Sequence, residues 1–198
     1  MPRKPPIPGR RALPAVFTYG SAIAAGISAE RLYAYRDQGL LEQIGRGLYR
    51  WSDEGEFDAD LLEIAYRVPR ATLCLDTALA RHGLTDAIPH RTDVAIPRGR
   101  RIPVLRTPVD IHSFAGNTFE IGREEIAVDN GLSIGIYSAE RSIIDVIRLR
   151  HREGTAVAWE ALRRWLRRRG SQPGALLDLA TRFHGVEPVV RQALEIIL

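Results

Sequence analysis

Arginine, tyrosine and serine side chains recur at short intervals between residues 28 and 50, and their chemistry suits nucleic-acid binding. The planar guanidinium of arginine donates two parallel hydrogen bonds to a phosphate or to the edge of guanine. Hydroxyl groups add neutral donors, which commonly bond phosphate oxygens. The candidate contact residues are Ser28, Arg31, Tyr33, Arg36, Arg46 and Arg50.

A helix and a tight turn are predicted to precede most of these residues. Thr18 caps the helix, and Ile23 and Ala24 are expected to face inward. Gly26 supplies the left-handed backbone conformation in which helices commonly end. Ser28 then caps a second helix, so the pattern predicts a helix-turn-helix.

The second helix has one apolar side. Leu32, Tyr35 and Leu40 fall near helical spacing and should face the core, while Gly39 ends the helix. In a helix-turn-helix the second helix lies in the major groove, with its N-terminal part against base edges. We therefore expect the arginine and the tyrosine near its start to reach bases or phosphates, and Arg36 to reach a phosphate.

A short β-hairpin follows the second helix. Leu41–Ile44 and Leu48–Trp51 are predicted strands, joined by the turn at 45–47 (Gly-Arg-Gly). Arg46 would lie at the tip of this wing, where it can reach a phosphate or the minor groove, and Arg50 would assist it. Helix, turn, helix and hairpin together predict a winged helix-turn-helix domain over residues 12–52.

The positive charge of the chain is concentrated in this N-terminal part. Residues 1–50 carry eight Lys/Arg against three Asp/Glu, whereas residues 51–198 carry twenty against twenty-one. A polyanion would therefore bind the N-terminal part. Residues 1–11 form a basic, proline-rich tail, which is either disordered or an arm that follows a DNA groove. Ala12 to Phe17 allows one short helix, interrupted by Pro14.

Composition narrows the class of protein. Apolar residues make up 45% of the 198, as in a globular protein, and no apolar run approaches the ~18 residues that span a bilayer. The basic N-terminus lacks the hydrophobic segment of a secretory signal. Cys74 is the only cysteine, which excludes an internal disulfide and suits a reducing cytoplasm, and we expect it to be a buried apolar residue.

Residues 53–198 are predicted to form a second domain of mixed α and β structure. The boundary is placed near Asp53 in the acidic segment 52–58. Helices are expected from Leu61 to Val68 and from Ala71 to His82, with helices again from Ser138 to the end of the chain. Four strands are expected between them, at Asp93–Ile96, Val109–Ser113, Glu124–Val128 and Ser133–Tyr137. The fold class is therefore α+β, with a winged helix-turn-helix, then a mixed domain ending in a helical bundle.

The arrangements of potentially catalytic residues in the sequence are weak signals. Gly20–Ser21 with Asp58 and Asp60 has the residue types of a nucleotidyltransferase, but its spacing is far too long for two-metal chemistry. The five histidines form no i, i+4 pair, and no nucleophile elbow or phosphate loop occurs. His82 is expected to have a structural role at a helix end. We therefore expect no enzyme activity, cofactor or metal.

Two further basic clusters lie in the second domain. They are either solvated surface or a second surface that contacts DNA or a partner. Asp145 and Glu140 are expected to pair with Arg141 or Arg148 within one helix. The members of the basic clusters are Arg98, Arg100, Arg101, Arg106, Arg163, Arg164, Arg167, Arg168 and Arg169.

Several segments resemble AbiEi-type antitoxins when taken in order. TALARHGLTDAIPHRTDVAIPRGRR resembles that family's His-Gly-Leu segment, and YSAERSIIDVIRLRHREG resembles its Glu-Arg helix. The N-terminal part, which ends in RGLYRW, is similar to the family's winged helix-turn-helix, and LLDLATRFHGVEPVVRQALEIIL is similar to its closing segment. The resemblance extends over roughly residues 15–198.

The resemblance implies a cytoplasmic autorepressor and antitoxin. Its partner would be double-stranded DNA, bound at inverted repeats in its own promoter by a monomer or by two copies assembling on the DNA. A nucleotidyltransferase-like toxin would be functionally linked, and direct contact with it is not implied. Three alternatives stay open: a protein-interaction module with a degenerate head, a stand-alone regulator without a toxin, and a nuclease.

Overall fold

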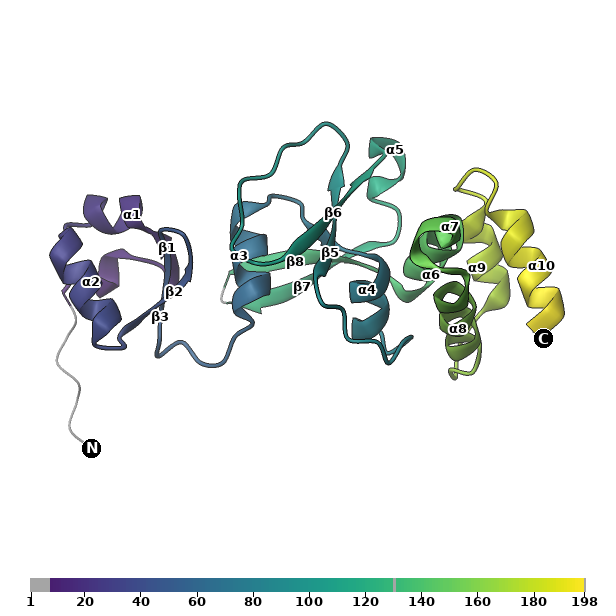
Figure 1. Ribbon diagram of the computed structural model, residues 1–198, viewed down its shortest axis with the longest axis horizontal. Coiled ribbons are helices and arrows are strands. Elements are labelled where there is room, and N and C mark those ends of the chain that lie inside the picture. Colours follow the sequence, from purple (N-terminus) through teal and green to yellow (C-terminus); the bar gives the residue numbers. More distant parts are fainter. Residues whose placement is uncertain (1–7, 130, 198) are drawn as a thin grey trace. The chain divides into compact units, whose positions relative to one another are not determined.

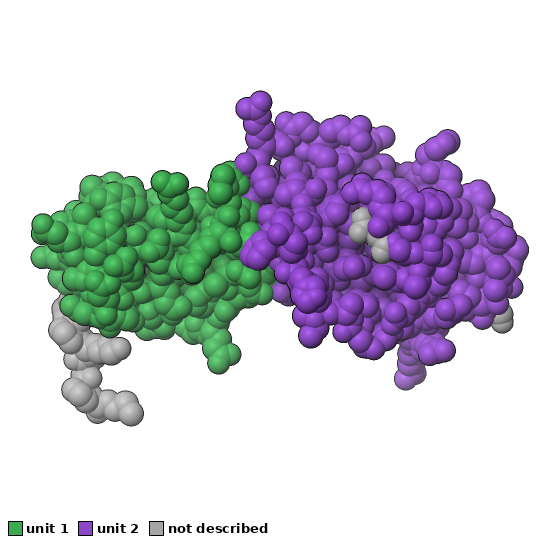
Figure 2. Space-filling model, viewed as in Figure 1, with its two compact units in different colours: residues 1–67, 103–107, 127–132 green, residues 68–102, 108–126, 133–198 purple. Residues whose placement is uncertain are grey.

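The computed structural model describes residues 8–129 and 131–197, and it combines helices with two β-sheets (Figure 1). The mixed α and β composition expected from the sequence is therefore confirmed. The chain divides into two compact units, which Figure 2 colours separately. The first contains residues 8–67, 103–107 and the described part of 127–132, and the second contains the remainder. This division does not test the boundary expected near Asp53, which stays a prediction.

The first unit begins with a three-stranded antiparallel sheet of order β1-β3-β2. A short turn η1 (Arg10–Ala12) precedes β1 (Val16–Thr18), and β2 (Leu41–Gly45) and β3 (Leu48–Trp51) form the expected hairpin. Strand β1 replaces the short helix expected before Phe17, because Phe17 pairs with Tyr49 across the sheet. Tertiary pairing outweighs local helical preference here.

Helices α1 (Tyr19–Ala24) and α2 (Ala29–Asp37) lie between β1 and the hairpin in the chain. Both begin at the predicted caps: Thr18 Oγ1 accepts from the Ser21 amide, and Ser28 Oγ accepts from the Arg31 amide. Gly26 has φ +83° in the turn between them. The expected inward face of α1 was wrong, since Ala22 is buried and Ile23 is 42% exposed.

Helix α3 (Ala59–Arg67) completes the first unit together with a distant segment of the chain. Its Glu63 is buried, and Glu63 Oε2 accepts from the Thr107 amide at 2.9 Å and from the Arg106 amide at 3.0 Å. Asp60 Oδ1 accepts from Thr107 Oγ1. Segment 103–107 is thus fixed to α3 by bonds to two carboxylates, of which that of Glu63 is buried, and such bonds stabilise more than neutral bonds do.

The second unit is built around a five-stranded sheet of order β6-β5-β4-β8-β7. Strands β5 (Thr92–Pro97), β6 (Val109–Phe114), β7 (Arg123–Asp129) and β8 (Leu132–Tyr137) match the four expected strands. Instead of one helix from Ala71 to His82, β4 (Thr72–Leu73) pairs with β5 and β8, and α4 (Leu75–Arg81) follows it. Apolar residues in a central strand and in a buried helix give similar sequence patterns, which explains the error.

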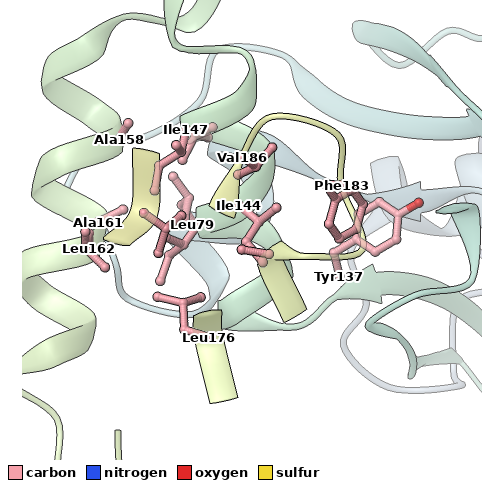
Figure 3. Packing of buried hydrophobic residues seen from close by; sticks show 14 of the residues in the cluster. Leu79, Tyr137, Ile144, Ile147, Ala158, Ala161, Leu162, Leu176, Phe183 and Val186 are labelled. Carbon is pink, nitrogen blue, oxygen red and sulfur yellow. The ribbon is translucent and has the colours of Figure 1, made fainter. Parts of the chain in front are cut away.

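The remaining helices are α5 (Gly116–Phe119), α6 (Ala139–Arg148), α7 (Arg150–Glu153), α8 (Thr155–Leu166), α9 (Pro173–Ala180) and α10 (Glu187–Ile197). Ser138 caps α6 as expected, and Ile144 and Ile147 of this helix are fully buried. Figure 3 shows them packed with Leu79 of α4 and Leu162 of α8. Cys74 belongs to the same buried cluster, as expected. No helix in the described part of the chain is long and apolar enough to cross a membrane.

Candidate nucleic-acid interface

Helix α2 is held against the core of the first unit by one side and exposes the others. Leu32 is fully buried and Tyr35 is 9% exposed, in a cluster with Phe17 and Trp51. Ser28, Arg31, Tyr33 and Arg36 are all exposed, as their predicted role requires. The apolar spacing that fixes the helix therefore also fixes which side chains remain accessible.

The exposed residues of α2 do not form one cluster. Tyr33 and Arg36 are three residues apart, so they share a side of the helix, and the Arg36 guanidinium lies 5.1 Å from the centre of the Tyr33 ring. Arg36 Nε and Nη2 also donate to Asp37 Oδ1, at 3.0 and 2.8 Å. Arg31 comes two residues before Tyr33, and such residues do not face one another on a helix.

The hairpin presents Arg46 at its turn. Arg46 is exposed, and its backbone carbonyl accepts a hydrogen bond from the Arg67 guanidinium. Gly47 has φ +63°, and its carbonyl accepts from the Tyr19 amide at 2.9 Å. The turn is therefore tied to α1 and α3 through its backbone, which leaves the Arg46 side chain free. No described residue bonds or pairs with the side chains of Arg31 and Arg46.

A hollow of about 430 Å³ lies between α2 and the hairpin. Its lining comes from four elements and the turn of the hairpin. The lining residues are Tyr19, Tyr33, Arg36, Gln43, Gly47 and Tyr49. Tyr19, Gln43 and Tyr49 were missed from the sequence, although four of the six tyrosines fall within residues 19–49. That concentration is the signal that could have identified them.

Arg50 does not belong to this surface, contrary to expectation. Its side chain is 1% exposed, and its Nε donates to Asp129 Oδ2 at 2.8 Å. Its Nη atoms donate to the carbonyls of Glu54 and Gly55, and the guanidinium lies 4.1 Å from the centre of the Phe57 ring. A guanidinium with these buried partners has a structural role, so Arg50 is not one of the candidate DNA contacts.

The other basic clusters are divided in the same way between paired and unpaired residues. Arg164 Nη1 donates to Asp86 Oδ1 at 2.7 Å, and Arg168 donates to the carbonyl of His82. Arg163 and Arg167 are exposed, and they line shallow hollows beside Ile196 and Ile197.

The basic cluster in the loop between β5 and β6 contains four exposed arginines, which belong to two different units. Arg106 falls in the first unit, and the other three fall in the second. The other three are Arg98, Arg100 and Arg101.

Residues weighed for catalysis have structural partners. Asp58 Oδ1 accepts from the Leu61 amide at the start of α3, and Asp60 bonds Thr107. His82 Nε2 lies 2.7 Å from the Tyr137 carbonyl, which confirms its structural role at the end of α4. No three His, Cys, Asp or Glu side chains among the described residues are grouped so that they could hold a metal ion.

Within α6 the carboxylates behave partly as expected. Asp145 pairs with Arg141 at 2.8 Å and with Arg148 at 3.0 Å, both within the helix. Glu140 instead accepts a hydrogen bond from Trp165 Nε1 of α8 at 2.9 Å. The expected ion pairs of Asp145 are confirmed, whereas Glu140 joins two helices.

Residues 14–50 match a family model described as "Transcriptional regulator, AbiEi antitoxin". The resemblance to AbiEi antitoxins is confirmed over this segment. The match covers both helices and nearly the whole hairpin, and the candidate contacts from Ser28 to Arg46 all lie within it. AbiEi proteins of this description are regulators and antitoxins, which is not an enzyme class. No curated protein matches the chain.

Proposed function

We propose that this protein is a DNA-binding transcriptional repressor with an AbiEi-type head. The head, residues 12–52, is a winged helix-turn-helix, and residues 53–198 form the antitoxin domain. The match of residues 14–50 to an AbiEi regulator supports the head. The order β1, α1, α2, β2, β3 supports it as well, because it places a helix pair before a hairpin.

In this proposal α2 lies in the major groove and the hairpin follows the DNA backbone. Arg31 and Tyr33 contact bases or phosphates, while Ser28 and Arg36 contact the backbone. Arg46 contacts a phosphate beside the groove. The observation that carries this assignment is that Arg31 and Arg46 are exposed and lack a partner in the described parts of the chain. An exposed cation without a protein partner gains most from a phosphate.

The repressor would act on its own promoter and serve as an antitoxin. One head reads a short half-site, so stable repression requires two copies on an inverted repeat. A nucleotidyltransferase-like toxin would be functionally linked to the repressor, and no stable complex between the two proteins is required. The exposed arginines of the second domain, such as Arg98 and Arg163, remain a proposed second surface for DNA or a partner.

The experiment that tests the head is a gel shift with the promoter DNA upstream of the gene. Arg31→Gln/Arg46→Gln should weaken binding on the order of 100-fold, because each arginine contact contributes roughly 1–3 kcal/mol. The slope of log affinity against log salt should fall by about 2, since two phosphate contacts are lost. The circular dichroism spectrum and the melting temperature should not change, because both side chains are exposed.

The matched control removes the same charge elsewhere. Arg152→Gln/Arg182→Gln changes two exposed arginines of the second unit and should leave the affinity within about twofold of the wild type. Equal binding by the wild type and by the variant at residues 31 and 46 would overturn the head assignment. A protein that binds a partner through apolar contacts would instead show little dependence on salt.

The antitoxin role has its own test. If a nucleotidyltransferase is encoded beside this gene, its expression alone should arrest growth, and co-expression of the protein should restore growth. Arrest that persists would contradict the antitoxin role and leave a stand-alone regulator.

A further inference from the structure

The hollow between α2 and the hairpin is a feature of the head that the predicted contacts explain only in part. Three tyrosines line it, one from each of α1, α2 and β3, and they are Tyr19, Tyr33 and Tyr49. Tyr19 is 37% exposed and Tyr33 is 42% exposed, whereas the Tyr49 ring is 3% exposed. Tyr49 packs against Phe17, with ring centres 6.2 Å apart, so it reaches the hollow by its outer end.

The hydroxyl groups of these three tyrosines have no hydrogen-bond partner within residues 8–129 and 131–197. Of the other three tyrosines, Tyr35 and Tyr137 have such a partner among the described residues, and Tyr66 has none. Tyr137 donates to the Phe119 carbonyl at 2.9 Å, and Tyr35 donates to the Pro8 carbonyl at 3.4 Å. Because none of the three hydroxyls at the hollow is committed to an internal bond, all three can donate to the acceptor oxygens of a ligand there.

The charge of the hollow favours an anion. Arg36 lines it, and Asp37 engages only the Nε and Nη2 atoms of its guanidinium, so Nη1 remains available to another acceptor. No carboxylate is among the lining residues. Burial raises the pKa of the Tyr49 hydroxyl, which keeps it protonated and able to donate.

We propose that the hollow binds one phosphodiester group of a DNA backbone strand, with the three tyrosine hydroxyls and Arg36 Nη1 as donors. The assignment rests on the proposed function, and it names the chemical group that this part of the head takes. Phosphate oxygens accept and never donate, which matches a lining rich in donors. The volume of about 430 Å³ also admits the adjoining deoxyribose, which the tyrosine rings would contact.

This assignment distinguishes the two sides of α2. The side with Tyr33 and Arg36 holds the backbone strand against the hairpin, and the side with Arg31 is left to the groove. Contacts made by neutral hydroxyls strengthen binding without releasing a counterion, so they leave the salt slope unchanged. Arginine contacts change both the affinity and the salt slope.

The test measures the affinity of the full chain for three duplexes of unrelated sequence over a series of salt concentrations. Tyr19→Phe/Tyr33→Phe/Tyr49→Phe should weaken binding to all three on the order of 100-fold with an unchanged salt slope. Arg36→Gln should lower the slope by about 1. Tyr66→Phe is the matched control, because Tyr66 is an exposed tyrosine of the first unit outside the hollow, and it should bind like the wild type.

Two results would overturn this inference without contradicting the proposed function. The wild type could bind all duplexes while the triple variant binds equally well, or the loss could be confined to one sequence, which indicates base contacts. Failure of the wild type to bind any duplex would instead refute the proposed function. If the triple variant melts earlier, the exposed pair Tyr19→Phe/Tyr33→Phe takes its place, with an expected loss of roughly tenfold.

A further measurement distinguishes binding of a DNA phosphodiester from binding of the free phosphate ion. Inorganic phosphate alone is titrated into the protein, and the ring signals of the three tyrosines are followed by NMR. Weak binding, abolished in the triple variant, is expected, because a free ion lacks the rest of the duplex. Tight binding of the free ion, unaffected by added DNA, would overturn the assignment to DNA.

Discussion

Arg141 of the second unit and the candidate arginines of the head differ in burial and in their hydrogen-bond partners. In the second unit Arg141 is fully buried, with Nε bonded to Asp145 and Nη1 to the carbonyls of Thr118 and Ile121. Its guanidinium lies 4.2 Å from the centre of the Tyr137 ring. In the head, Arg31 and Arg46 are exposed, and no described residue pairs with their side chains.

The contrast shows that the number of arginines does not locate an interface. The second unit contains many arginines, and several of them serve its own packing and helix contacts. An arginine is a candidate contact only where it is exposed without an internal acceptor among the described residues, as are Arg31 and Arg46 in the head and Arg163 and Arg167 in the second unit. Because an exposed ion pair contributes little to stability, such unpaired residues are retained at little cost to the fold.

The largest effect expected from this comparison comes from Arg141→Ala. Removing one partner of a buried ion pair leaves Asp145 without its main counter-charge, and two hydrogen bonds to backbone carbonyls are lost as well. Denaturant unfolding should show a loss of about 4 to 5 kcal/mol. A loss below about 1 kcal/mol would mean that the buried network does not stabilise the second unit.

Arg50→Met tests the one head arginine that is paired and buried. The unfolding free energy should fall by about 3 kcal/mol, because the ion pair with Asp129 and two bonds to carbonyls are lost while the apolar stem is kept. Below the melting temperature its DNA affinity should equal that of the wild type. A stable Arg50→Met protein that fails to bind DNA would restore Arg50 to the interface.

The smallest effect concerns an exposed pair of the second unit. The hydrogen bond from Arg164 holds the pKa of Asp86 below its ordinary value of 3.8. The lowered pKa in the folded state means that the stabilisation is present above the ordinary value and is lost as pH falls through the folded pKa. NMR titration of Asp86 should show this low pKa, and Arg164→Gln should return it to the ordinary value. An unchanged pKa in that variant would show that the pair does not persist in solution.

Local signals in the sequence predicted much of the head. The caps Thr18 and Ser28, the turn at Gly26 and the two strands of the hairpin depend on neighbouring residues, and all of them were confirmed. The four long strands of the second unit were confirmed for the same reason. Strands β1 and β4 were missed because each is fixed by pairing with a strand distant in the chain.

The candidate site was predictable only in part. Helical spacing correctly left Arg31, Tyr33 and Arg36 exposed, yet all four residues of β3 are buried, so strand alternation gave no warning about Arg50. Its ion-pair partner, Asp129, is 79 residues away. The hollow likewise depends on Tyr19 and Tyr49, which the fold brings together from α1 and β3. Contacts between residues far apart in the sequence leave no periodic pattern from which they could be predicted.

The most direct test of the account is the salt dependence of promoter binding for the wild type, for Arg31→Gln/Arg46→Gln and for the control Arg152→Gln/Arg182→Gln. We predict a steep slope for the wild type and the control, and a slope smaller by about 2 with affinity lower on the order of 100-fold for the variant in the head. Identical slopes and affinities for all three proteins would contradict the claim that the unpaired arginines of the head bind DNA.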